Sequence, residues 1–185
     1  FDRHRRYARY YNTDHKLRNG LIRLGHAVLG IDTRAVTHDL APFGIRAWGV
    51  RRMRAEVLAV AGTLRPDLIV FGHTDLIDDA TYETLRERLP HARFATFFVD
   101  TFTLGRVAVD RLIPRAARMD AVFATTADRE AIAPIAPRRN LFWFMPNPVD
   151  GGIETGRVDE VPRADLPYDG MFLGTDIGTR RQQLD

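Results

Sequence analysis

Three polar side chains follow short apolar runs of the chain, at positions where they could do acid–base chemistry. His73 and Asp75 come just after the run 68–71, and together they could form an imidazole oriented by a carboxylate. Asp100 directly follows the most apolar run, 94–99, and could act as a base or contact a hydroxyl acceptor. The carboxylates also have plainer interpretations. Asp100 could cap the turn that follows it, and Asp75 could cap a helix that begins near residue 77.

A second set of polar side chains precedes the first apolar run. Asp14 and Arg18 are four residues apart, as are His15 and Asn19, so each pair shares one face of the helix that the apolar spacing predicts for residues 7–24. We expect Asp14, His15 and Arg18 to contact a bound ligand. For Asp14 and Arg18, an ordinary surface ion pair is the plainer interpretation.

A glycine-bounded turn near the end of the sequence, 174–178, is the best candidate for phosphate binding. Gly174 and Thr175 stand between a predicted strand and a helix start, where backbone amides can approach oxygen atoms closely. Arg180 could reach a diphosphate from that helix start. The turn matches neither a P-loop nor the dinucleotide-binding fingerprint. Since no cluster of His and Asp has the spacing of metal ligands, the sequence predicts neither a metal nor a cofactor.

The elements that position these residues alternate regularly between helix and strand. Helices of ten or more residues are predicted at 7–24, 47–64, 77–89 and 107–117, and a short helical turn at 128–132. Strands are predicted at 27–31, 68–71, 94–99, 121–124 and 141–144. Such alternation with continuously apolar strands indicates an α/β fold with a doubly wound parallel sheet, covered on both faces. These sheets bind ligands beyond the carboxyl ends of their strands, where His73 and Asp100 stand.

The composition changes after residue 146, where prolines and glycines cluster up to residue 167. After this stretch, one strand, one turn and a helix start cannot bury their own apolar face, so they are expected to open a second lobe. The predicted organisation is a first lobe at 1–149, a linker at 150–167 and the truncated start of a second lobe at 168–185. The beginning also looks clipped, because a doubly wound domain usually opens with a strand.

Composition excludes several classes of protein. The 185 residues are 45% apolar and 28% charged with a net charge of +3, which is typical of a folded chain and not of a disordered one. No run approaches the roughly 20 consecutive apolar residues that span a bilayer. Without cysteine there is no disulfide framework and no thiolate zinc site, so a soluble, cytoplasmic protein is predicted. Lys16 is the only lysine, and the resulting preference for arginine does not by itself predict a nucleic-acid partner.

A basic and aromatic cluster opens the sequence. It combines four arginines with three tyrosines: Arg3, Arg5, Arg6, Arg9, Tyr7, Tyr10 and Tyr11. The cluster could contact an anionic acceptor or membrane head groups, as in the synthesis of lipid-linked glycans, or it could be a solvated basic face.

Three pieces of the sequence, in this order, carry a resemblance to a known family. They are the run 10–28, which contains Leu24-Gly25-His26-Ala27-Val28, the strand end Phe97-Phe98-Val99-Asp100, and Phe172-Leu173-Gly174-Thr175 followed by Arg180-Arg181. Together they resemble the N-terminal lobe of two-Rossmann-lobe (GT-B) glycosyltransferases, most closely the spore-maturation-protein-like glycosyltransferases.

The resemblance implies a Rossmann-like acceptor lobe followed by a donor lobe. The activity it implies is transfer of a sugar from a nucleotide-sugar donor to a glycan, lipid-linked glycan or other hydroxyl acceptor. Asp100 and His73 would then be catalytic, Asp14, His15, Arg18 and Asp75 would bind the acceptor, and Gly174, Thr175 and Arg180 the donor. The isolated chain should be inactive. The alternatives are a sugar-nucleotide epimerase of the same fold and a non-catalytic, two-lobed ligand-binding module.

Overall fold

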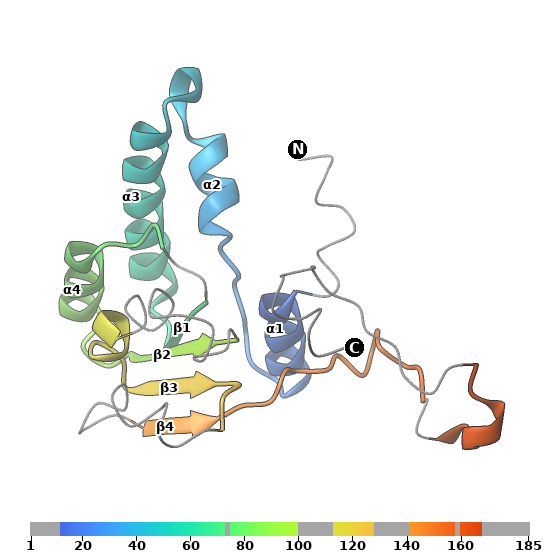
Figure 1. Ribbon diagram of the computed structural model, residues 1–185. Helices are drawn as coiled ribbons and strands as arrows, with labels where there is room; N and C mark the ends of the chain where they lie inside the picture. Colours follow the sequence, from blue (N-terminus) through green and yellow to red (C-terminus); the bar gives the residue numbers. More distant parts are fainter. Residues whose placement is uncertain (1–11, 73–74, 100–112, 128–140, 158–159, 168–185) are drawn as a thin grey trace. The chain divides into compact units, whose positions relative to one another are not determined.

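The computed structural model describes residues 12–72, 75–99, 113–127, 141–157 and 160–167 (Figure 1). The chain divides into two compact units, Phe1–Asp150 and Gly151–Asp185. The helices and strands that follow belong to the first unit. In the second unit the described part contains one short 3-10 helix, η5, at Arg163–Asp165.

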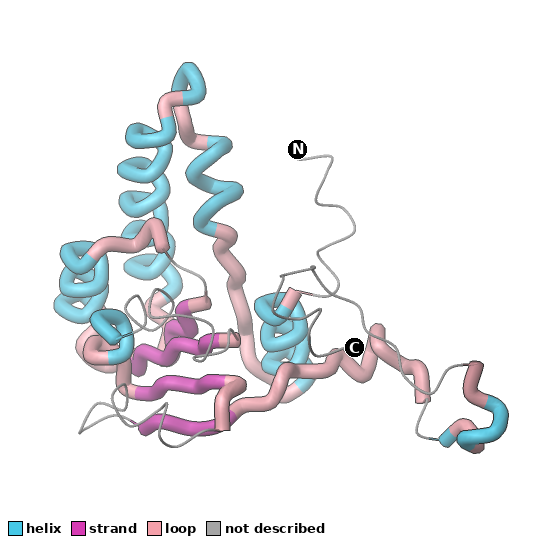
Figure 2. Tube along the Cα trace, in the orientation of Figure 1, coloured by secondary structure: helices cyan, strands magenta, loops and turns pink. Residues whose placement is uncertain are grey.

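The first unit is built on a four-stranded sheet in which every neighbouring pair is parallel. The strands are β1 (Leu68–Phe71), β2 (Arg93–Phe98), β3 (Ala121–Ala124) and β4 (Leu141–Phe144), and they lie in the order of the sequence. Figure 2 shows the four strands side by side. The four corresponding strand predictions are confirmed, because short, continuously apolar runs with bulky or aromatic side chains are typical of buried parallel strands.

One face of the sheet carries the hydrophobic core. Phe71, Phe94 and Val122 alternate onto this face along β1, β2 and β3, and all three are buried. The ring of Phe71 meets those of Tyr82 and Phe94 edge-on, with centroids 4.9 and 5.5 Å apart, a geometry that aromatic pairs favour. The chain therefore fixes the sheet mainly by burying aromatic side chains from β1 and β2.

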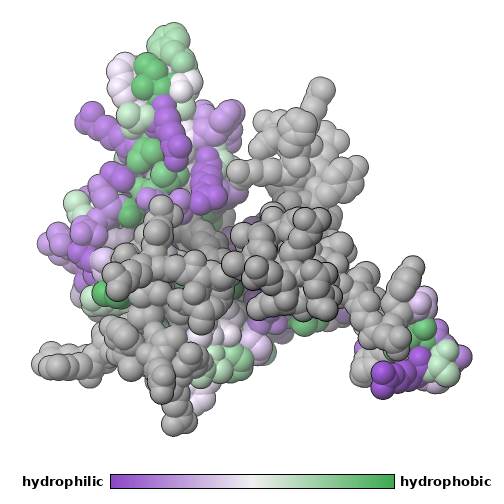
Figure 3. Space-filling model, in the orientation of Figure 1, coloured by the Kyte–Doolittle hydropathy of each residue, from purple (hydrophilic) through white to green (hydrophobic). Residues whose placement is uncertain are grey.

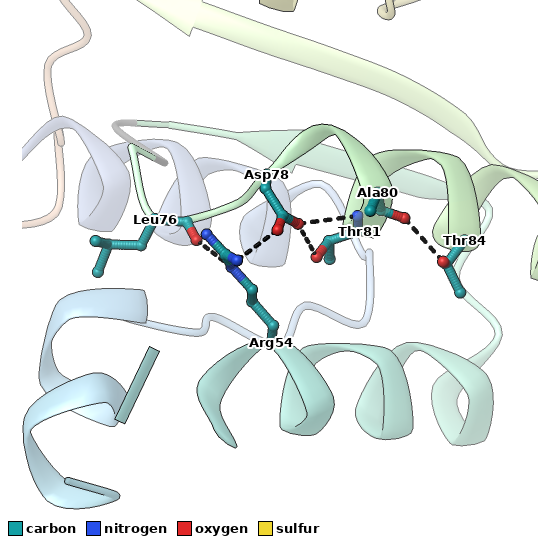
Figure 4. A network of polar contacts seen from close by, with 6 residues as sticks. All are labelled: Arg54, Leu76, Asp78, Ala80, Thr81 and Thr84. Atoms are coloured by element: carbon teal, nitrogen blue, oxygen red, sulfur yellow. Dashed lines mark hydrogen bonds and ion pairs between the residues drawn. The ribbon is translucent and has the colours of Figure 1, made fainter. Parts of the chain in front are cut away.

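Three helices confirm predicted ones: α1 (Thr13–Arg23), α3 (Arg46–Leu64) and α4 (Asp79–Arg88). Helix α4 begins at Asp78, whose carboxylate accepts hydrogen bonds from the backbone N–H and the hydroxyl of Thr81. Asp78 also accepts a hydrogen bond from Arg54 of α3, which donates a second one to the carbonyl of Leu76 at 2.7 Å (Figure 4). The helix cap predicted for Asp75 is thus wrong, since Asp78 provides it.

Two local predictions fail between α1 and α3. The apolar run 27–31, expected to form a strand, is neither helix nor strand, and no backbone hydrogen bond joins it to another described segment. A strand needs a partner at the right distance, and local composition does not supply one. Residues Thr33–Asp39 form an unpredicted helix, α2, whose N-cap Asp32 accepts from the N–H groups of Arg34 and Ala35 at 3.0 Å.

The architecture is therefore an α/β fold with an all-parallel sheet and helices, consistent with a Rossmann-like domain. Residues 113–116, inside the predicted helix 107–117, are helical. Three predicted segments lie outside the described residues: residues 107–112 of that helix, the turn at 128–132 and the second-lobe segment 168–185. Among the described helices, none is long and apolar enough to cross a membrane.

Candidate functional site

The first turn of α1 lies against the carboxyl end of β1. The side chain of Asn12 caps α1 by accepting a hydrogen bond from the backbone N–H of Asp14 at 3.0 Å. A Cβ atom on Gly72, the residue after β1, would lie 2.7 Å from Asp14 Oδ1 and 3.0 Å from Phe97 Cζ. A larger residue at position 72 would displace the Asp14 carboxylate or the Phe97 ring from these positions. Asp14 is therefore placed at the sheet edge where parallel sheets bind ligands.

Asp75 lies three residues beyond Gly72 and is held by an arginine from another element. One guanidinium nitrogen of Arg34, in the first turn of α2, donates to both carboxylate oxygens of Asp75, at 2.8 and 3.2 Å. Both side chains are about half exposed. Arg115, from the segment before β3, donates to the carbonyl of Gly72 at 3.0 Å. Helix α2, the end of β1 and residue 115 thus meet around one carboxylate.

The charge state of Asp75 follows from these neighbours. Partial burial alone would raise its pKa, but a backbone hydrogen bond and the guanidinium groups of Arg34 and Arg115 outweigh burial and lower the pKa below 3.8. Asp75 is therefore ionised at neutral pH. An ionised carboxylate paired with arginine is suited to accepting a hydroxyl hydrogen bond or orienting a neighbouring cation, and poorly suited to giving up a proton.

His15 and Arg18 follow Asp14 on α1. His15 is half-buried, and its Nδ1 atom is enclosed without a hydrogen-bond partner in the part of the chain that the structure describes. The stem of Arg18 lies by Gly30, with its Cδ 3.7 Å from where a Cβ of residue 30 would be. No ion pair joins Asp14 to Arg18, so the plainer interpretation of this spacing is wrong. An enclosed imidazole nitrogen without a partner marks a place where a ligand group or water can bind.

A buried carboxylate that the sequence reasoning missed anchors α1. Asp150 is 2% exposed and accepts hydrogen bonds from Asn19 Nδ2 at 2.6 Å and from the guanidinium of Arg23. Asn19, expected to share a face with His15, thus has a structural partner. Asp150 stands at the start of the predicted linker 150–167, yet it belongs to the first unit. Only the loss of apolar periodicity after Phe144 was visible in the sequence, and that gave no sign of burial.

The remaining predicted site residues lie outside the described residues: His73, Asp100, Gly174, Thr175, Arg180 and the basic cluster 3–11. Gly72 directly precedes His73, and Val99 directly precedes Asp100. These two described residues follow β1 and β2, which pair directly with each other. Thr125 Oγ1 of the next strand end donates to the carbonyl of Val99 at 3.2 Å. The ends of three adjacent strands therefore meet at one edge.

The described part of this edge offers two carboxylates and guanidinium groups. It contains no group of three or more His, Asp or Glu side chains that could hold a metal ion. Such side chains can hydrogen-bond a polyhydroxylated or anionic ligand. Comparisons of the chain with protein-family models, with curated proteins and with solved structures found no match.

Proposed function

We propose that this chain supplies the acceptor-binding lobe of a GT-B glycosyltransferase, which moves a sugar from a nucleotide-sugar donor to a hydroxyl group of a glycan or lipid-linked glycan. One observation carries the proposal. The carboxyl edge of a parallel sheet brings together Asp14 from the first turn of α1 and Asp75 from beyond the end of β1, and these were two of the four acceptor contacts expected from the sequence.

Each described side chain has a chemical task in this proposal. The carboxylates of Asp14 and Asp75 accept hydrogen bonds from acceptor hydroxyls. Arg34 keeps Asp75 ionised and fixes its orientation. Sugars present several hydroxyl groups in a fixed geometry, so an array of charged acceptors on two rigid elements can select among them.

The transfer step needs a base near the attacking hydroxyl and donors for the departing diphosphate. In this proposal Asp100 or His73 accepts the hydroxyl proton as the oxygen attacks the anomeric carbon. The bond from that carbon to the diphosphate breaks, and the nucleotide leaves with the electron pair. Gly174, Thr175 and Arg180 belong to the diphosphate side, where backbone amides and a guanidinium stabilise the negative charge.

The test is an assay of nucleoside-diphosphate release from a panel of nucleotide sugars, with and without glycan acceptors, using the product of the complete reading frame. Acceptor-dependent release supports transfer. Epimerised donor without any acceptor would instead identify a sugar-nucleotide epimerase, and ligand binding without turnover would identify a binding module. Either result overturns the proposal, and so does robust transfer by residues 1–185 alone, because the donor lobe would then be unnecessary.

Variants locate the chemistry within the protein. Asp100→Ala or His73→Ala, whichever is the base, should lower kcat by about 100-fold or more. Asp14→Ala should raise the acceptor KM by about tenfold and leave kcat nearly unchanged, because it removes a charged hydrogen-bond acceptor. Asp79→Ala removes an exposed carboxylate from the first turn of a different helix, α4, and should change neither constant. If Asp14→Ala and Asp79→Ala behave alike, the acceptor site is elsewhere.

A further inference from the structure

Helices α2 and α3 form a hairpin that ends in exposed apolar side chains. The two helices approach closely, since a Cβ on Gly49 would lie 2.2 Å from the carbonyl oxygen of Thr37. Between them, the 3-10 helix η2 (Pro42–Gly44) makes the turn (Figure 1). At this tip Phe43 is 96% exposed, Trp48 is 53% exposed, and Ile45 is also exposed. Figure 3 shows apolar residues gathered at this end of the hairpin.

Phe43 has an unfavourable backbone conformation as well as an exposed ring. Its φ of 53° and ψ of 22° are left-handed, a region that aromatic residues rarely adopt. Burial of the ring inside the protein does not compensate for this, because almost all of the side chain faces solvent. Glycine would adopt the same conformation with less strain. A strained backbone that holds an aromatic ring outward indicates a contact outside the chain.

Positive charge predominates around this tip, although the exposed acidic residues Asp39 and Glu56 flank it. Residues 40–55 contain four arginines and no acidic residue. Arg54 is paired with Asp78, whereas Arg46, Arg51 and Arg52 are exposed and form no ion pair with any described residue. Arg51 and Arg52 lie three and four positions after Trp48 in α3, so they share its helix face. The tip therefore combines apolar and cationic side chains on one surface.

We infer that the tip of the α2–α3 hairpin docks onto a membrane surface that contains anionic lipids. The rings of Phe43 and Trp48 enter the head-group layer, and Arg46, Arg51 and Arg52 contact lipid phosphates, which is how amphipathic basic segments bind such surfaces. A lipid surface suits a protruding turn, because a stable protein interface needs about 800 Å² from each partner and usually a complementary groove. This inference does not depend on the proposed sugar transfer.

The experiment is co-sedimentation of the 185-residue chain with phosphatidylcholine vesicles that contain either no anionic lipid or about 30% phosphatidylglycerol. Binding should require the anionic lipid and should weaken with added salt. Phe43→Gly should lower the partition coefficient about fivefold, because it removes the ring from the lipid contact. The same change relieves the φ strain, so the variant should unfold at the same or a higher temperature than the parent chain.

Charge and position are tested by two further variants. The double variant Arg51→Gln, Arg52→Gln should lower the partition coefficient about thirtyfold, since each arginine near an anionic surface contributes about fivefold. Leu24→Ala is the matched control: it truncates another exposed apolar side chain, at the end of α1, and should bind as the parent does. Equal losses in Leu24→Ala and Phe43→Gly would overturn the inference.

The two tryptophans of the chain allow the contact to be located directly. In a Trp143→Phe variant, Trp48 is the only emitter, and vesicles with brominated acyl chains should quench it. In a Trp48→Phe variant, the emission of Trp143 should remain unquenched. The membrane assignment would be overturned if the chain did not bind vesicles or if only Trp143 were quenched. It would also be overturned if the chain self-associated and Phe43→Gly abolished that association without any effect on lipid binding. This last result would identify a second copy as the partner.

Discussion

The two ends of the same sheet use their charged side chains differently. At the amino end, Asp120 accepts from the backbone N–H of Phe94 at 2.7 Å and from Arg86 at 2.9 Å. Arg86 also donates to the carbonyl of Arg118 at 2.8 Å, and its guanidinium lies 3.8 Å from the centre of the Phe94 ring. At the carboxyl end, the exposed side chain of Asp14 has no hydrogen bond to a described residue.

This difference separates polar groups that hold the fold from polar groups that remain available. A hollow of about 410 Å³ borders the amino-end cluster, but Arg86 and Asp120 on its wall are committed to each other and to the backbone. Satisfied buried networks stabilise a structure, whereas partly satisfied polar groups at a ligand-binding edge can accept a ligand. The presence of a hollow is therefore a weaker indication of function than the state of the groups that line it.

The largest effect is expected at the amino end. Asp120→Ala removes the acceptor for both Phe94 N–H and Arg86, and should lower the free energy of unfolding by about 2 kcal/mol. Urea unfolding followed by circular dichroism measures this change. Asp79→Ala, which breaks a more exposed ion pair with Arg118, should cost less than about 0.5 kcal/mol. Similar losses in both variants would mean that the amino-end network is no more than a surface ion pair.

A smaller effect is expected where α1 meets the sheet. Gly72→Ala places a methyl group against Asp14 and the ring of Phe97, and should destabilise the fold by about 1 kcal/mol while weakening acceptor binding. The control is Gly62→Ala within α3, where a Cβ meets nothing within 4 Å. That change should stabilise the protein by up to about 1 kcal/mol. Thermal unfolding of the two variants should thus shift in opposite directions, and a shift in the same direction would refute the close contact at Gly72.

Acid should weaken both ends of the sheet. For Asp75 and Asp120, charged hydrogen bonds and arginines lower the pKa despite partial burial, and for Asp78 the hydroxyl of Thr81 has the largest effect in lowering it. A carboxyl group whose folded pKa is depressed stabilises the fold above its unfolded pKa, and this contribution disappears as the pH falls through the folded value. The urea midpoint should therefore be constant above about pH 5 and fall below about pH 4. Asp120→Asn should show a shallower decline than the parent chain; an equal slope would exclude Asp120 as a contributor.

The smallest stability change is expected for the half-exposed pair at the carboxyl end. Asp75→Ala should alter the free energy of unfolding by less than about 0.5 kcal/mol, because an exposed ion pair contributes little. Its acceptor affinity should nevertheless fall about tenfold, as expected for a lost charged hydrogen bond. Isothermal titration with an acceptor glycan and urea unfolding of the same preparation separate the two readouts. A loss of stability without a loss of affinity would make Asp75 a structural residue.

The strands could be predicted because each carries its signal locally. Four short runs of apolar residues, beginning at residues 68, 94, 121 and 141, became β1 to β4 within one residue at each end. The run 27–31 has a similar composition but no backbone partner among the described residues, so composition was not sufficient there. Helix α2 was missed because seven residues give too little periodicity, although Asp32 at its N-cap was a usable signal.

The candidate site was predictable only in its location. The rule that ligands bind at the carboxyl ends of parallel strands pointed to Asp75, whereas Asp14 was singled out by its helical spacing, and nothing in the sequence placed it at that edge. The hydrogen-bond partners of the site and of α1 were not predictable from the sequence. Arg34 and Asp75 are 41 residues apart in the chain, and Asn19 and Asp150 are 131 residues apart. Such contacts depend on tertiary packing, and the local pattern around Asp75 and Asp78 could not decide which carboxylate caps α4.

The sequential order of the strands has a consequence for how the protein is made. Each of β2, β3 and β4 pairs with the strand that precedes it in the chain, so none of these four described strands must wait for a distant one or insert between two others. Ribosomes release the amino-terminal part first, and short sequence separation between partners speeds their association. The sheet can therefore grow outward from β1 during translation, because the strand formed last offers unpaired backbone groups to the next strand that emerges.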